Sequence, residues 1–397
     1  MVFCFFVSSY ITFIQGDLLN KPIYLDYNGT TPCDPAVVEA MKLFFTDDFG
    51  NPSSSHWYGI KPRQAVEAAR RQVADLIGCL PEEIFFTSGG TESNNHAIKG
   101  TARVLGHKGR HIVTSAVEHP SVLEVCRYLE DEGFETTRVA VDNQGMIDPV
   151  KIEQALRPDT VLVTIMHANN EVGSLQPVAE IAGLLKKRGI VLHTDAAQSL
   201  GKIPVDVSSL GVDLLSIAGH KLYAPKGIGA LYVRNGLKLD MFCHGAGQEK
   251  GWRAGTENVP GIVGLGKGCE LAAENLDTNM AHMKKLCDRL YDGITATVAD
   301  VRLNGHPEKR LPNTLSLSFK GLEANRILEE VGLEIAASAG AACHSDSVTI
   351  SHVLEAMNVP VEWAKGTLRF SVGRTSTMAE IDRTIDVMSM AIDTLRT

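Results

Sequence analysis

The stretch LVTIMHANNEVGSLQPVAEIAGLLKKRGIVLHTD, residues 162–195, decides the fold class. Its short apolar runs at 162–167 and 190–195 are typical of buried strands, and the amphipathic segment at 178–188 is typical of a helix. A strand, a helix and a second strand in this order form a βαβ unit with parallel strands. The stretch therefore predicts an α/β fold built on a mostly parallel sheet.

The same alternation continues on both sides of this unit. Further strands are expected at 83–87, 111–115 and 214–218, and further helices at 61–77 and 149–155. Helices cover both faces of such a sheet, and ligands bind beyond the carboxyl ends of its strands. The residues that follow the predicted strands are therefore the candidate site.

The pattern changes near residue 278, where a second unit is expected to begin. A helical stretch at 275–296 leads to a strand at 315–319, a loop rich in small residues at 336–347, a helix at 351–357, a strand at 367–372 and a last helix from residue 378. A chain of 397 residues also suits two domains better than one. We predict a large domain over residues 31–278 and a smaller α+β domain formed by residues 21–30 and 279–397.

Residues 1–20 begin with the almost entirely apolar run MVFCFFVSSYITFI. The run is too short to span a bilayer comfortably. No Lys or Arg precedes Lys21, whereas secretory signals and transit peptides carry basic residues. We predict that these residues form an extension outside the fold, and that the protein is cytoplasmic with no membrane partner.

Charge and cysteine content exclude several classes of function. The formal net charge is −9, whereas a nucleic-acid partner requires a surplus of Lys and Arg. The eight cysteines are scattered, without the spacing of zinc ligands, and a chain of this size does not need a disulfide framework. We therefore expect no nucleic-acid partner and no metal site, and ordinary thiols at every cysteine except Cys343.

A candidate phosphate-binding loop, SGGTESN at residues 88–94, follows the predicted strand at 83–87 and begins a helix. Gly90 lets the backbone approach an anion, the helix N-terminus offers free N–H groups, and Thr91 adds a hydroxyl. It is not a Walker loop, since no Gly-Lys-Ser/Thr follows. Taken alone, the stretch fits an ordinary capped turn better than a phosphate site.

Two charged residues, Asp195 and Lys221, stand at or just after the ends of later predicted strands. Pyridoxal phosphate (PLP) requires a lysine amine for its Schiff base and a carboxylate beside its ring nitrogen, which lets the ring take up electrons. A single lysine on a loop is usually solvated. The phosphate loop, Asp195 and Lys221 together nevertheless predict a PLP site.

Polar residues at other strand ends fit the same site. His119 can stack on a ring and transfer protons, and Asn170 and Gln198 can donate hydrogen bonds to a ring hydroxyl. A structural histidine and an ordinary turn at residues 169–170 are the alternatives.

Cys343 and Arg369 lie in the predicted smaller domain. The loop SAGAACHSD, residues 338–346, surrounds Cys343 with small residues, a setting for a reactive thiolate rather than a packed thiol. Arg369 lies in a predicted strand and suits a two-pronged contact with a substrate carboxylate. A buried cysteine in a turn and a structural ion pair are the respective alternatives.

Several motifs, taken together, resemble those of the class V, fold-type-I PLP enzymes, namely the cysteine desulfurases and selenocysteine lyases. They include YLDYNGTTP (24–32), FTSGGTESNN (86–95), HTDAAQSLGK (193–202), GHKLYAPKGIGALY (219–232) and SAGAACHSD (338–346). The resemblance runs from about residue 23 to residue 374. It implies a large domain with a mostly parallel mixed sheet and a smaller α+β domain that carries the loop of the nucleophilic cysteine.

The resemblance also implies a role for each candidate residue. Around the ring, these are Lys221 (Schiff base), Asp195 (ring nitrogen), His119 (stacking and proton transfer), and Asn170 and Gln198 (ring hydroxyl). Around the phosphate and the substrate they are Gly90, Thr91 and His220 (phosphate), Thr256 (phosphate of a partner subunit), Asn28 and Arg369 (substrate carboxylate), and Cys343 (persulfide-forming nucleophile). The role of Thr256 implies a homodimer.

The motifs indicate two different substrates. Ala218 and the sequence Cys343-His344-Ser345-Asp346 look like selenocysteine lyases, whereas residues 347–357 are similar to desulfurases of the NifS/IscS type. We predict a PLP-dependent lyase that releases L-alanine from L-selenocysteine, with L-cysteine as the alternative substrate. A cysteine desulfurase would pass persulfide sulfur to an acceptor protein for Fe–S cluster or thio-cofactor synthesis. Transamination and a non-catalytic sulfur-transfer scaffold are the rival functions.

Overall fold

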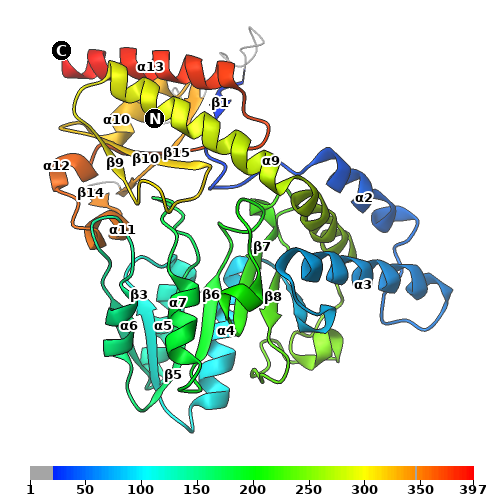
Figure 1. Ribbon diagram of the computed structural model, residues 1–397. Coiled ribbons are helices and arrows are strands. Elements are labelled where there is room, and N and C mark those ends of the chain that lie inside the picture. Colours follow the sequence, from blue (N-terminus) through cyan, green and yellow to red (C-terminus); the bar gives the residue numbers. More distant parts are fainter. Residues whose placement is uncertain (1–20, 345–346) are drawn as a thin grey trace, which may run out of the picture.

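A seven-stranded mixed sheet forms the centre of the larger part of the protein in the computed structural model, which describes residues 21–344 and 347–397 (Figure 1). Its strands, in spatial order, are β2 (Ile84–Thr87), β8 (Gly229–Val233), β7 (Leu214–Ala218), β6 (Val191–Asp195), β5 (Thr160–Thr164), β3 (His111–Ser115) and β4 (Glu135–Val139). Only β8 runs antiparallel to its neighbours. The predicted α/β class is confirmed.

Two of these strands were missed by the sequence patterns. β8 lies between β2 and β7 and is reached from β7 without a crossover helix, so it breaks the alternation of strand and helix. β4 is an edge strand with partly exposed residues, and its sequence ETTRV lacks the apolar run of a buried strand.

Helices cover both faces of the sheet because alternate strand residues point to opposite sides. Ile112 and Leu162 pack with α4 (Gly90–Leu105) and α5 (Pro120–Asp131) on one face. Val113 and Val163, one residue further along each strand, belong to the core on the other face. That core also contains residues of α3 (Trp57–Ile77), α6 (Pro149–Ala155), α7 (Val178–Leu185) and the first part of α9 (Val259–Thr297). Three short helices contribute as well: α8 (Val207–Leu210), α11 (His352–Ala356) and α12 (Val361–Ala364).

A second apolar core lies around an antiparallel sheet in the C-terminal third (Figure 1). The sheet order is β12 (Ser338–Ala339), β15 (Thr367–Ser371), β10 (Thr314–Phe319) and β9 (Val301–Asn304). The end of α9, α10 (Ala324–Val331) and α13 (Met378–Arg396) contribute to this core.

The N-terminal segment adds to this second core. Leu25 is fully buried in it, and β1 (Ile23–Tyr24) pairs with β11 (Ile335–Ala336) in parallel. Residue 278, the predicted boundary, lies inside α9, which is one continuous helix of 39 residues that contributes to both cores.

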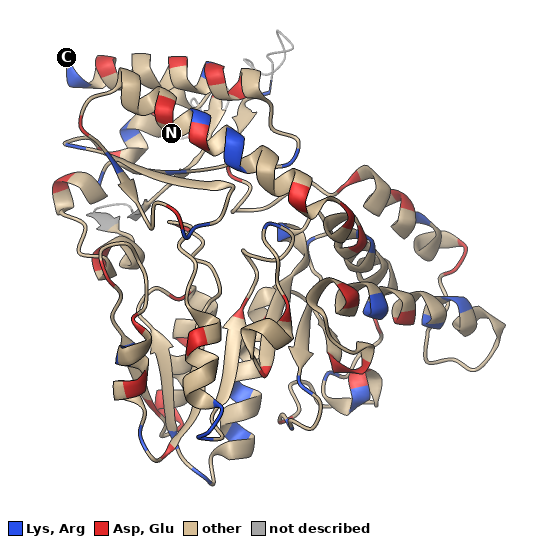
Figure 2. Ribbon diagram, in the orientation of Figure 1, with Lys and Arg blue, Asp and Glu red and all other residues tan. Residues whose placement is uncertain are grey.

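The hairpin of β13 (Ala341–His344) and β14 (Ser347–Ile350) leads into α11 (His352–Ala356). The predicted N-terminal extension, residues 1–20, lies outside the described residues. In the ranges that are described, no helix combines the length and apolar character of a membrane span. Figure 2 shows acidic and basic residues interspersed along the long helices α3, α9 and α13.

Candidate active site

A cavity of about 390 Å³ lies at the carboxyl ends of β6 and β7, between the two cores. Most of the side chains that the sequence predicts for the site line it: Asn28, Gly90, Thr91, His119, Asn170, Asp195, Gln198, His220, Lys221 and Arg369. Segments far apart in the chain thus meet where parallel strands end, as expected for an α/β sheet.

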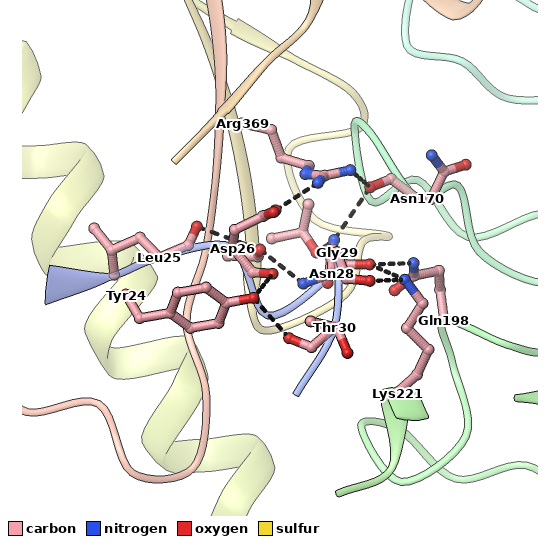
Figure 3. Close-up of polar contacts among 12 residues, drawn as sticks. Tyr24, Leu25, Asp26, Asn28, Gly29, Thr30, Asn170, Gln198, Lys221 and Arg369 are labelled. Carbon is pink, nitrogen blue, oxygen red and sulfur yellow. Dashed lines mark hydrogen bonds and ion pairs between the residues drawn. The ribbon is translucent and has the colours of Figure 1, made fainter. Parts of the chain in front are cut away.

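Lys221 ends a short 3₁₀ turn, Gly219–Lys221, directly after β7. Its Nζ donates to the backbone oxygen of Gly29 at 2.7 Å and to that of Asn28 (Figure 3). Burial, and then the positive charge of Arg369, lower the pKa of Lys221 to about 8. Near pH 7, a larger share of this amine is therefore uncharged than in an ordinary lysine. The uncharged amine is the form that makes Schiff bases and accepts protons.

Asp195 ends β6 and is held by two donors. Asn94 Nδ2 donates to its Oδ2 at 2.7 Å, and the backbone N–H of Ala197 donates to its Oδ1 at 2.9 Å. Asn94 belongs to the SGGTESN stretch but was not singled out from the sequence; it lies on the first turns of α4 and also donates to Ser121 at 2.8 Å. The carboxylate is thus fixed at the cavity wall.

His119 caps the N-terminus of α5, because its Nδ1 accepts from the backbone N–H of Ser121 at 3.1 Å. The ring proton of the neutral imidazole therefore belongs on Nε2. Burial lowers the pKa of His119, although Asp195 acts in the opposite direction. A neutral ring at the cavity wall suits stacking and proton transfer.

The end of the cavity near α4 carries the phosphate-loop residues. A Cβ on Gly90 would lie 3.2 Å from the Cβ of Ala218, so two small residues leave room beside the helix N-terminus. His220 Nδ1 lies 3.1 Å from Thr30 Oγ1, and burial lowers the pKa of His220 to about 4. A helix N-terminus with a hydroxyl and an imidazole beside it is a donor set that fits a phosphate group.

Arg369 reaches the cavity from β15 in the second core. It pairs with Asp26 at 2.6 Å and donates to the backbone oxygen of Asn170 at 3.0 Å, while its buried Nε has no partner (Figure 3). The two contacts fix the guanidinium and use one N–H on each terminal nitrogen, so each of these nitrogens keeps a second N–H for an acceptor such as a carboxylate. The ion pair that was the alternative interpretation is present together with these unused donors.

Thr256 lies elsewhere. It lines a separate cavity of about 200 Å³ with Arg253 and Glu257, so its phosphate-binding role stays a prediction that requires a second subunit. Cys343 lies on β13, but its side chain lies outside what the structure describes.

The base of the hairpin that carries Cys343 is anchored beside the cavity. Ser351 Oγ donates to Glu171 at 2.5 Å, and His352 Nε2 contacts the backbone oxygen of Glu118, the residue before His119, at 2.9 Å. These two contacts join the start of α11, whose Val353 and Leu354 belong to the core of the larger part, to loops that line the cavity. They hold the end of β14 next to the predicted ring-binding residues.

Glu118 itself is a buried carboxyl that the sequence did not assign. It accepts from Ser115 Oγ at 2.6 Å and from the Met166 backbone N–H at 2.9 Å. Burial raises its pKa from the ordinary 4.5 to about 8, despite these donors.

Replacing Glu118 with Gln is therefore expected to remove a pH-dependent loss of stability. A carboxyl with a raised pKa in the folded state stabilises the protein fully below about pH 4.5, and this contribution is lost as the pH rises through about 8. We compare the free energy of unfolding of Glu118→Gln with that of wild type at each pH. Between pH 5 and a pH above 8, this difference should shift in favour of the variant by on the order of 2 kcal/mol. Urea unfolding at several pH values measures this, and parallel stability curves would contradict it.

The chain matches the Aminotransferase class-V family over residues 23–384. It is 49% identical over 380 residues to the cysteine desulfurase IscS of Dictyoglomus turgidum, and the match covers 96% of each chain. It is 47% identical to the protein of the same name from Methanosarcina thermophila, and that match covers 95% of this chain and 93% of the other. A solved NifS-like protein superimposes with a TM-score of 0.89 at 38% identity, covering 94% of this chain and 100% of the other. A structure titled "SspA in complex with cysteine" matches with a TM-score of 0.79 at 38% identity, covering 89% and 100%.

Proposed function

Because this chain belongs to the class V aminotransferase family and is a PLP-dependent enzyme of the cysteine desulfurase type, we propose that it takes sulfur from L-cysteine and releases L-alanine. The observation that carries the proposal is the meeting of Lys221, Asp195 and Arg369 in one cavity beside the anchored base of the Cys343 hairpin. L-selenocysteine, the first prediction from the sequence, has no specific support among the relatives, which are named as cysteine desulfurases.

Each cavity residue has a binding role in this proposal. Lys221 would hold PLP covalently, Asp195 would lie against the ring nitrogen, and His119 would stack on the ring. Gly90, Thr91 and His220 would bind the phosphate. When bound, PLP supplies an electron sink for the substrate Cα.

The chain's own groups then move protons and position the substrate. Arg369 binds the substrate carboxylate with the remaining N–H groups of its terminal nitrogens, supported by Asn28. The neutral Lys221 amine accepts the Cα proton, since its lowered pKa makes it a base near neutral pH. The Cys343 thiolate attacks the substrate sulfur, and the carbon–sulfur bond breaks with its electron pair left on Cβ. Cβ takes a proton and Lys221 returns the proton to Cα, which gives alanine.

The sulfur then remains on Cys343 as a persulfide, ready for an acceptor protein. Thr256 lies too far from this cavity to line it, so its predicted phosphate contact supports a homodimer with composite sites. The decisive measurement is kcat/KM for L-cysteine and for L-selenocysteine side by side, with alanine, sulfide and selenide determined. A higher efficiency on selenocysteine would restore the first prediction.

Replacing Arg369 with Lys is expected to raise KM for L-cysteine about 10- to 100-fold with a smaller change in kcat. The reason is that a lysine cannot reproduce a planar contact with a carboxylate, which is worth roughly 1.5–3 kcal/mol. Arg70→Lys is the matched control, because both guanidinium side chains are 12% exposed and ion-paired, and Arg70 does not line this cavity. An unchanged KM in Arg369→Lys would exclude the carboxylate role.

A further inference from the structure

A second lysine, Lys202, is buried behind side chains that line the same cavity. It is only 5% exposed, and its Nζ donates to Asn28 Oδ1 at 3.0 Å and to Gln198 Oε1 at 2.9 Å. Among the ion pairs formed by the described residues, none includes Lys202. The residue belongs to the HTDAAQSLGK motif, but the sequence pattern gave it no role.

A buried lysine without an anionic partner is unusual and costly. Burial, and then the positive charges of Lys221 and Arg369, place the pKa of Lys202 well below its ordinary 10.5. The charged groups that act on it are therefore both cations, and both disfavour its protonated form. Such a group adds little to stability, so its position calls for another explanation.

Lys202 contacts the oxygen, and not the nitrogen, of both amides. The amide nitrogens consequently point elsewhere: Gln198 Nε2 donates to the Asn28 backbone oxygen at 3.0 Å, and Asn28 Nδ2 donates to Thr314 Oγ1 at 2.8 Å. The same Asn28 backbone oxygen accepts from Lys221, as Figure 3 shows. Lys202 therefore lies behind two side chains that line the cavity, and both Gln198 and Lys221 donate to the backbone oxygen of Asn28.

We propose that Lys202 is a positioning residue that fixes the amide orientation of Gln198, so that its N–H groups are presented at the Lys221 end of the cavity. The amide of Asn28 is held independently, because Asn313 Nδ2 also donates to its Oδ1 at 3.0 Å. The proposal rests on the proposed function and on the ring-hydroxyl role that the family resemblance implies for Gln198. A fixed N–H donor stabilises the anionic form of that oxygen. Without Lys202, the Gln198 amide can rotate and present its oxygen instead, which repels an anion.

The consequence is spectroscopic as well as kinetic. The visible absorption band of the PLP-loaded enzyme changes with pH, and weaker stabilisation of the ring oxygen anion moves its midpoint to higher pH. Lys202→Met keeps an unbranched side chain that extends as far as Cε and removes the amine. We expect its midpoint to rise by about one pH unit and its kcat/KM to fall roughly 10-fold.

The test is a double-mutant cycle with Gln198→Leu. If Lys202 acts through Gln198, Lys202→Met should shift the midpoint in the wild-type background and add little in the Gln198→Leu background. Additive shifts, or an unchanged midpoint in Lys202→Met, would overturn the proposal.

Thermal unfolding of the PLP-free proteins separates this role from a structural one. Asn28 Oδ1 keeps Asn313 as a donor and the Gln198 amide is free to rotate, so Lys202→Met should melt within a few degrees of wild type. A large loss of stability would show that Lys202 acts in folding and would overturn the positioning role. A wild-type protein with no visible PLP band would instead refute the proposed function itself, so the two failures are distinguishable.

Discussion

Cys343→Ala is expected to lose at least about 10³-fold of the sulfide-releasing activity on L-cysteine, while its PLP absorption and melting temperature stay those of wild type. A covalent nucleophile cannot be replaced by a methyl group, and the thiolate is the form that attacks sulfur. The cofactor signal should survive because the predicted PLP contacts all lie on other segments: α4, the ends of β6 and β7, and the loops after β3 and β5. Sulfide and alanine assays with a reductant present, beside an absorption spectrum, measure both parts.

Cys243→Ala is the matched control for this variant. Cys243 is exposed and does not line the cavity, so its removal should leave activity unchanged. Full activity of Cys343→Ala on cysteine would exclude the nucleophile role. Formation of a keto acid instead of alanine would favour transamination, the rival reaction that needs no cysteine.

Most of the site could be predicted from the sequence because its residues follow strand ends. Gly90, Asp195 and Lys221 belong to three local motifs, and the geometry of parallel strands brings such positions to one edge of the sheet. Local sequence therefore indicated the location of the site before any long-range contact was known. The roles of these residues stay predictions.

What the sequence missed depends on contacts between distant segments. Lys202 and Glu118 are informative because they are buried, and burial follows from packing against Asn28, 174 positions away from Lys202, and against the loop of Met166. No local pattern marks a lysine as buried. The same limit applies to α9, whose continuity across residue 278 comes from packing against both cores.

The substrate was the weakest inference for a related reason. It depended on Ala218 and on the residues around Cys343, and a few side chains cannot fix the distance between a nucleophile and a substrate atom. A hundredfold preference between sulfur and selenium is only about 2.7 kcal/mol of transition-state free energy. Placement of the β13–β14 hairpin alone can supply that amount.

Lys221→Ala is expected to lose covalent attachment of PLP and at least about 10³-fold of kcat, because the same amine is predicted to hold the cofactor and to accept the Cα proton. Activity that depends on the neutral amine should rise as the pH increases towards about 8, the lowered pKa of Lys221, and this limb of the pH profile should be absent from the variant.

Borohydride reduction followed by peptide mass spectrometry tests the attachment: wild type should carry the PLP mass on Lys221, and Lys221→Ala should carry none. Lys226→Ala, on the exposed loop that follows, is the control and should behave as wild type. A PLP label on Lys202 of the wild-type protein would contradict the assignment, and so would a label on any lysine of the variant together with retained activity. Lys202 is the alternative to test, because it is close enough to Lys221 for the charge of Lys221 to lower the pKa of Lys202.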